Sequence, residues 1–263
     1  MKNLYCLFFM IILSVTNVSA QNKELPILRF GLIADIQYAD CDAANNRYYR
    51  NSLNKLADCV ADINRNKVDF SINLGDLSDR KFEDMDSVLL RLNQLNEHVY
   101  NTSGNHDYHG VTDNNILYQK LNMPSEYYSF KKKNWRFIVL NTNEISSYAN
   151  TTGTEKEQEL KQMLEAIKLK GGNNAYPWNG GISKTQKQWL KSLLADSEKN
   201  NENVIILSHH PLYPEFGLIA LNASDILDII DDYTCVKAMI AGHHHEGEFA
   251  IYKNIPAITA EGM

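Results

Sequence analysis

Six short apolar runs rich in Ile, Val, Leu and Phe constrain the fold of this chain more than any other feature. Runs of this length without polar alternation are typical of strands that are buried on both faces. The runs are Ile27 to Ala34, Val68 to Leu74, His98 to Thr102, Trp135 to Leu140, Val204 to Leu207 and Val236 to Ala241. Helix-period segments lie between several of them, at Arg47 to Ile63, Phe82 to Leu95, Glu155 to Leu169, Ser183 to Leu194 and Ser224 to Ile230. This alternation predicts a layered α/β fold.

The rest of the chain fits one domain, which we expect to span residues 21–263. With 44% apolar residues, a chain of this length can bury one large core. The segment 141–182 holds several Gly- and Asn-rich stretches and one helix, so we interpret it as a loop-rich insertion. Ser183 and Gln186 form a predicted capping box, and two antiparallel strands are expected at Glu248 to Tyr252 and Pro256 to Ala260.

The first twenty residues have the pattern of a secretory signal peptide. Lys2 precedes an apolar stretch from Leu4 to Val15, and small residues end at Ala20, where we expect cleavage. The alternative is an uncleaved anchor, but the apolar stretch is shorter than the ~20 residues that span a bilayer. We therefore expect export, to the periplasm or the exterior, and no membrane association after residues 1–20 are removed.

Charge and cysteine content exclude two classes of protein. The chain has 26 Lys and Arg against 32 Asp and Glu, with no block of basic residues, which argues against nucleic-acid binding. Beyond the signal peptide, Cys41, Cys59 and Cys235 are far apart and lack CxxC spacing. They are expected to be small core residues, or one disulfide and a spare thiol, rather than a zinc site.

Polar clusters follow five of the six expected strands. They are Asp35-Ile36-Gln37, Gly75 to Asp79, Gly104 to Asp107, Ser208 to Pro211 and Gly242 to His245. Each cluster alone could be a turn. Together they would meet at the carboxyl edge of the sheet, where open α/β folds bind ligands, and this favours a metal site.

The five motifs, in this order, resemble the calcineurin-like metallophosphoesterase superfamily over Phe30 to Met263. The resemblance implies a four-layer α/β/β/α sandwich with mixed sheets. Three further stretches, together with Gln37 where most relatives have His, are similar to the manganese-dependent ADP-ribose/CDP-alcohol diphosphatase branch: Arg47 to Arg50, Met123 to Tyr128, and Asn179 to Ser183 leading to Gln188-Trp189-Leu190. Relatives continue beyond Glu261-Gly262, so we expect the last strand or strands to be missing and the edge at Pro256 to Ala260 to be unpaired.

The resemblance also implies a ligand set for two divalent metal ions. Asp35, Gln37 and His245 would hold the first ion, and Asn105, His209 and His243 the second. Asp76 would bridge both, as a carboxylate can. Oxygen and nitrogen donors without a thiolate suit Mn²⁺, which the branch favours, and are also compatible with Fe or Zn²⁺.

Two residues beside the ligands carry the expected catalytic roles. A metal-activated hydroxide would attack phosphorus. His106 would stabilise the transition state or protonate the leaving oxygen, and Asp79 would orient its ring. The alternative for Asp79 is a helix N-cap near Arg80 to Phe82.

Substrate contacts are assigned to a larger group. Arg47, Tyr48, Tyr49 and Arg50 are expected to begin the first helix and to bind the base or distal phosphate, while packing is the alternative for the aromatics. His210 and His244 either contact phosphate or face solvent. Weaker candidates for a base platform are Tyr148, Tyr176 and Trp178.

These expectations support an exported hydrolase of a phosphoanhydride in a small nucleotide-derived substrate such as ADP-ribose or a CDP-alcohol. The alternatives are a phosphomonoesterase, or a phosphodiesterase acting on cyclic nucleotides or other diesters. A metal-binding protein without turnover is disfavoured because the ligand set is complete and His106 is present.

Overall fold

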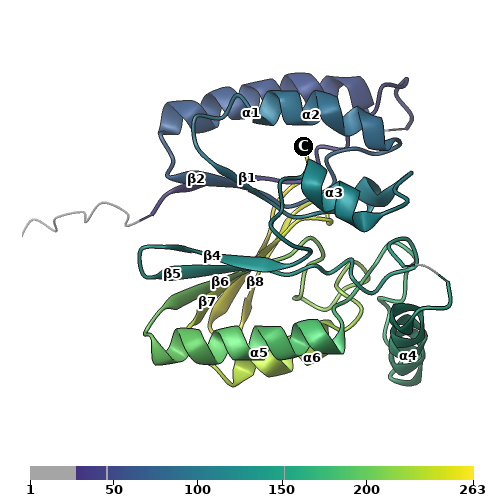
Figure 1. Cartoon of the computed structure of the whole chain (residues 1–263), viewed down its shortest axis with the longest axis vertical. Coiled ribbons are helices and arrows are strands. Elements are labelled where there is room, and N and C mark those ends of the chain that lie inside the picture. Colours follow the sequence, from purple (N-terminus) through teal and green to yellow (C-terminus); the bar gives the residue numbers. More distant parts are fainter. Residues whose placement is uncertain (1–27, 46, 151) are drawn as a thin grey trace, which may run out of the picture.

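The computed structural model describes residues 28–45, 47–150 and 152–263. Two β-sheets face each other, with α1 and α2 on the outer face of the smaller sheet and α5 and α6 on the outer face of the larger one (Figure 1). The predicted four-layer sandwich is therefore confirmed, while residues 1–20 lie outside the described ranges. The helices are α1 (Ser52–Asn66), α2 (Met85–Leu92), α3 (Asn114–Lys120), α4 (Glu155–Leu169), α5 (Lys184–Lys199) and α6 (Ala223–Asp231), with 3-10 turns η1 (Tyr49–Asn51), η2 (Phe82–Asp84) and η3 (His106–Tyr108).

The smaller sheet is parallel and the larger sheet is mixed. The smaller sheet has the order β1 (Phe30–Ile33), β2 (Phe70–Asn73), β3 (Val99–Asn101). The larger sheet has the order β4 (Tyr128–Lys132), β5 (Trp135–Val139), β6 (Asn203–Leu207), β7 (Val236–Ala241), β9 (Ile255–Thr259), β8 (Glu248–Tyr252). Strands β5, β6, β7 and β9 run parallel, so their carboxyl ends lie at one edge.

The carboxyl-terminal hairpin corrects one expectation. Strands β8 and β9 pair antiparallel, as predicted, with Glu248 opposite Thr259. However, β9 also pairs in parallel with β7, with Met239 opposite Ala257, so it lies inside the sheet. The predicted unpaired edge at Pro256 to Ala260 is wrong, and β8 is the outer strand instead.

Several element boundaries also differ from the sequence pattern. Helix α1 begins at Ser52 after the turn η1, so Arg47 and Tyr48 precede it. The sequence reading missed β4 and α3 entirely. Ser183 caps α5 by accepting from the Gln186 amide at 3.0 Å, as predicted. The second hydrogen bond of the predicted capping box is not made by Gln186. The Ser183 backbone amide donates instead to the Glu144 carboxylate at 2.9 Å.

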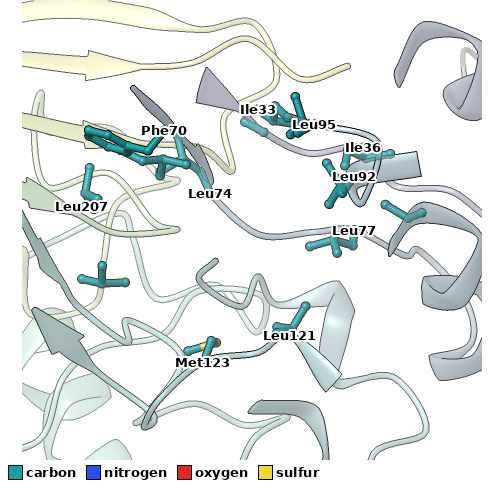
Figure 2. Close-up of a cluster of buried hydrophobic side chains, with 14 of the residues drawn as sticks. Ile33, Ile36, Phe70, Leu74, Leu77, Leu92, Leu95, Leu121, Met123 and Leu207 are labelled. Carbon is teal, nitrogen blue, oxygen red and sulfur yellow. The ribbon is translucent and has the colours of Figure 1, made fainter. Parts of the chain in front are cut away.

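The core between the two sheets is rich in aromatic rings. Phe70 of β2 is fully buried and its ring contacts those of Phe30, Phe130 and Phe137 at centroid distances between 5.2 and 5.7 Å. Figure 2 shows Phe70 near Leu207, which ends β6 of the opposite sheet. A second cluster lies between the larger sheet and helices α5 and α6. These layers fix the edge of both sheets at which the polar loops meet.

Two remaining expectations concern cysteines and membranes. Cys41, Cys59 and Cys235 are free thiols, so the alternative of one disulfide is not formed. Among the helices of the described ranges, none combines the length and apolar character that crossing a bilayer requires.

Candidate metal centre

The loops that follow β1, β2, β3, β6 and β7 bring the seven predicted ligands to one place. Four of these residues have left-handed backbone conformations, with φ of 51° at Asp35, 45° at Gln37, 57° at Asp76 and 68° at His243. A side chain with a Cβ adopts this region at a cost of about 1–3 kcal/mol, and such strain clusters at functional sites. The backbone is therefore bent sharply where β1, β2 and β7 deliver these four donors.

Close approach of two loops requires glycine at Gly75 and Gly104. A Cβ on Gly104 would lie 2.1 Å from an Asp76 carboxylate oxygen, and one on Gly75 would lie 2.4 Å from the Gly104 nitrogen. No side chain fits at either distance. These glycines let the loops after β2 and β3 touch, so that Asp76 and Asn105 reach the same site.

The first group of donors is carboxylate-rich. Ligand atoms of Asp35, Asp76 and His245 lie within 4.8 Å of one another, and His245 Nε2 is 3.6 Å from Asp35 Oδ1. The Gln37 amide nitrogen donates to Asp76 Oδ2 at 2.9 Å, which leaves the Gln37 carbonyl oxygen for a cation. Three oxygen donors and one imidazole nitrogen suit a hard or borderline divalent ion.

The second group is built around His209. Its Nε2 lies 3.0 Å from Asn105 Oδ1, 3.2 Å from His243 Nδ1 and 3.5 Å from Asp76 Oδ1. Asp76 thus contacts both groups, as a bridging carboxylate must. Electron-rich atoms that converge in this way repel one another unless a cation or proton lies between them. The residues present therefore fit two divalent cations, although each ligand role stays a prediction.

Hydrogen bonds select the ring nitrogen that each buried histidine offers. His209 Nδ1 lies 2.8 Å from the Leu74 carbonyl oxygen, and His243 Nε2 lies 3.1 Å from Asn179 Oδ1. A ring that donates a proton on one side keeps a lone pair on the other. Burial lowers the pKa of His209, and burial with neighbouring histidines lowers that of His243, which favours the neutral form of both rings that can ligate a metal.

His106 and Asp79 form a pair at the edge of the donor groups. His106 Nδ1 lies 2.9 Å from Asp79 Oδ1, and the Asp79 carboxylate also pairs with Arg47 at 2.6 Å and with Arg80 at 2.9 Å. Burial opposes charge on the His106 ring, but the Asp76 and Asp79 carboxylates outweigh it and raise its pKa to about 9. The N-cap alternative for Asp79 is not found, because η2 begins after Lys81 without a side-chain cap.

Comparisons with known proteins fit this geometry. The family model described as calcineurin-like phosphoesterase matches residues 28–247. The chain belongs to the calcineurin-like phosphoesterase family. It is 29% identical to a manganese-dependent ADP-ribose/CDP-alcohol diphosphatase of Oryza sativa subsp. japonica, over 91% of this chain and 84% of that protein. The Mus musculus protein of the same name is 30% identical, over 88% and 82%. A dimetal phosphatase structure from Danio rerio has a TM-score of 0.81 at 29% identity and covers 90% of this chain and 88% of that one.

This calcineurin-like phosphoesterase is accordingly a metal-dependent phosphoester hydrolase with a large cavity over the donors. The cavity has a volume of about 770 Å³. Its lining includes Gln37, Arg47, Asp76, Asn105, His106, His109, Tyr148, Trp178, His243, His244 and His245. A smaller cavity of about 230 Å³ adjoins it at Gln37, Arg47 and His245 and extends to Tyr48 and Tyr49. The site therefore has room for a substrate larger than inorganic phosphate.

The structure corrects two substrate assignments in this phosphoesterase. His210 is fully buried, with Nδ1 2.9 Å from Thr142 Oγ1 and Nε2 3.0 Å from the Trp178 carbonyl oxygen, so neither ring nitrogen is available to phosphate. Arg50 instead pairs with Asp40 and Asp42, each at 2.7 Å, on an exposed loop. His210 and Arg50 are thus bound to partners within the protein, and the spacing of residues along the sequence does not identify these partners.

The other substrate candidates differ in their exposure and in whether they line a cavity. Arg47 borders both cavities and contacts Asp79 of the His106–Asp79 pair. Tyr48 is exposed, whereas Tyr49 is buried and its hydroxyl accepts from Arg80 at 2.9 Å. His244 lines the larger cavity beside Phe216. Their roles stay predictions.

Sequence reasoning missed the supporting residues Asp107, Asn179 and His109. The Asp107 carboxylate accepts from the amides of Asp76, Leu77, Ser78 and Gly104 at 2.8–3.2 Å, and so fixes both ligand-bearing loops. His109 Nδ1 lies 2.8 Å from the Asp79 carbonyl oxygen. The signals for Asp107 and Asn179 were present, because both belong to quoted motifs, but no role had been given to them.

Proposed function

We propose that this calcineurin-like phosphoesterase uses two Mn²⁺ ions to hydrolyse the phosphoanhydride of a nucleoside diphosphate derivative, of the ADP-ribose or CDP-alcohol type. The observation that carries the proposal is the convergence of the seven donors beside the His106–Asp79 pair, with five of the donors and His106 lining one cavity. The relatives with the diphosphatase name support the choice of substrate, since their similarity covers most of this chain.

The protein's own residues perform the remaining tasks. When bound, a pair of divalent cations polarises the phosphate oxygens and makes a hydroxide nucleophile accessible near neutral pH. Asp79 engages His106 Nδ1, so the proton offered to the leaving oxygen is the one on Nε2. Arg47, at the junction of the two cavities, supplies positive charge for the second phosphate.

A substrate panel tests this proposal. We expect kcat/KM under one Mn²⁺ concentration to be higher for ADP-ribose or CDP-choline than for p-nitrophenyl phosphate or a cyclic nucleotide. A tenfold lead corresponds to ~1.4 kcal/mol of transition-state preference. A monoester or cyclic nucleotide that leads by this factor would reject the diphosphatase assignment and leave the family assignment intact.

Export is a separate proposal that rests on the pattern of residues 1–20. Expression of the full chain in a bacterial host followed by fractionation and intact-mass measurement tests it. We expect an exported protein that lacks the first 20 residues. A cytoplasmic protein of full mass would contradict export.

A further inference from the structure

Two aromatic rings stack in the segment between α4 and α5, and one of them lines the larger cavity. The rings of Tyr176 and Trp178 have centroids 4.8 Å apart and planes inclined by 6°. Their exposed fractions are 42% and 43%, so neither ring is needed to fill the core. Trp178 lines the cavity that also holds Asp76 and His106. Because Tyr176 stacks on one face of the indole, a planar ligand would have to bind the opposite face.

The backbone beneath Trp178 is held on both sides. Ser147 Oγ donates to the Pro177 carbonyl oxygen at 2.9 Å. The Trp178 carbonyl oxygen lies 3.0 Å from Nε2 of the buried His210. Asn179 Oδ1 contacts His243 Nε2 at 3.1 Å, which links the segment to a predicted metal ligand. An exposed ring on a fixed backbone loses little conformational freedom when it binds a ligand.

The Tyr176 ring is itself supported by a glycine. A Cβ on Gly217 would lie 2.7 Å from Tyr176 Cε2, so the ring packs closely against the Gly217 backbone. The Gly217 carbonyl oxygen accepts from Asn179 Nδ2 at 2.7 Å. Gly217 thus packs against the Tyr176 ring, which in turn stacks on Trp178. The exposed pair is therefore built into the fold.

We propose that Trp178, backed by Tyr176, is the platform on which the nucleobase of the substrate stacks. This inference rests on the proposed function and adds its base subsite. Stacking is sequence-tolerant, because every base has a π face. On this platform the base would contact the face of an aromatic ring and would not be recognised by a hydrogen bond from the platform. We therefore expect purine and pyrimidine nucleotides to bind with similar affinity.

Binding of AMP, CMP and ribose 5-phosphate to the Mn²⁺-loaded protein tests the platform without hydrolysis of a phosphoanhydride. In the unmodified protein we expect AMP and CMP to bind about fivefold or more tightly than ribose 5-phosphate, since base stacking on an aromatic ring contributes about 1–3 kcal/mol. Trp178→Ala should abolish the difference, Tyr176→Ala should reduce it, and Trp178→Phe should retain most of it. An undiminished preference for AMP in Trp178→Ala would overturn the proposal.

Tryptophan fluorescence gives an independent readout. The chain has three tryptophans, and Trp189 of α5 packs against Tyr127, so Trp189→Phe is a matched control. We expect AMP to quench the emission of the unmodified protein and of Trp189→Phe, but not of Trp178→Phe. Equal quenching in Trp178→Phe would place the base elsewhere.

The two proposals fail in different ways. Loss of the diphosphate preference in the substrate panel, with AMP still bound at Trp178, would reject the proposed reaction and keep the subsite. A retained diphosphate preference with no effect of Trp178→Ala on AMP binding would reject the subsite and keep the reaction.

Discussion

Replacement of His106 by Ala should remove catalysis while leaving the metal ions bound. The ring lies beside Asn105, but its Nδ1 is engaged by Asp79 at 2.9 Å and not by the donor groups. A general acid contributes about 10² to 10⁴ in rate, so we expect kcat for ADP-ribose to fall by that factor. Asp79→Asn weakens the charge-assisted hydrogen bond to His106, besides the pairs with Arg47 and Arg80, and a bond of about 1.5–3 kcal/mol corresponds to a loss of about 10- to 10²-fold.

The double variant shows whether Asp79 acts through His106. If it does, adding Asp79→Asn to His106→Ala should slow the enzyme by no more than about threefold, because the two side chains form one unit. Steady-state kinetics and Mn²⁺ titration calorimetry on the four proteins measure this. Multiplicative effects of the two substitutions would refute the coupling. Loss of bound Mn²⁺ in proportion to the loss of rate would instead make His106 a ligand.

Three further substitutions test the metal centre and the core. Asp76→Asn should be the most damaging ligand change, because Asp76 contacts both donor groups, and elemental analysis should show both metals depleted; full metal content would contradict the bridging role. Gln37→His should tighten metal binding at the first group, since imidazole is a stronger ligand than an amide oxygen, and unchanged Mn²⁺ affinity in calorimetry would count against that position. Phe70→Ala should lower the free energy of unfolding by about 3–5 kcal/mol in urea titrations, as expected for a fully buried ring, and a loss below about 1 kcal/mol would show that Phe70 is not central to the core.

The sequence was sufficient to predict that the five ligand motifs meet at the carboxyl ends of their strands. Each ligand motif directly follows an apolar run, and parallel strands bring their carboxyl ends to one edge whatever their lateral order. The pairing of Asp79 with His106 followed from the family resemblance, and the structure brings the two side chains within hydrogen-bonding distance. The local apolar pattern and the order of the motifs are therefore enough to place a residue that directly follows a strand.

The sequence did not predict contacts that depend on distant partners. His209 and His210 are adjacent, and only the fold shows that His209 contacts the donors while His210 binds Thr142 and the Trp178 carbonyl. Arg50 is a plausible phosphate ligand until Asp40 and Asp42 are found beside it. Spacing along the chain carries no information about either choice.

Neither strand β4 nor the lateral order of the strands could be predicted from the sequence pattern. Strand β4 includes Lys131 and Lys132, which weaken the apolar signal of Tyr128 and Phe130, so it was missed. The position of β9 between β7 and β8 follows from a crossover connection, which neither hydropathy nor turn residues specify. Lateral order in a sheet is decided by packing of whole elements rather than by local preference.

Anomalous diffraction from crystals grown with Mn²⁺ tests the two-metal account most directly. The account predicts two anomalous peaks roughly 3.5–4 Å apart, with one Asp76 oxygen near each. One peak should lie among Asp35, Gln37 and His245, and the other among Asn105, His209 and His243. A single peak, or two peaks that do not share Asp76, would contradict a dinuclear centre.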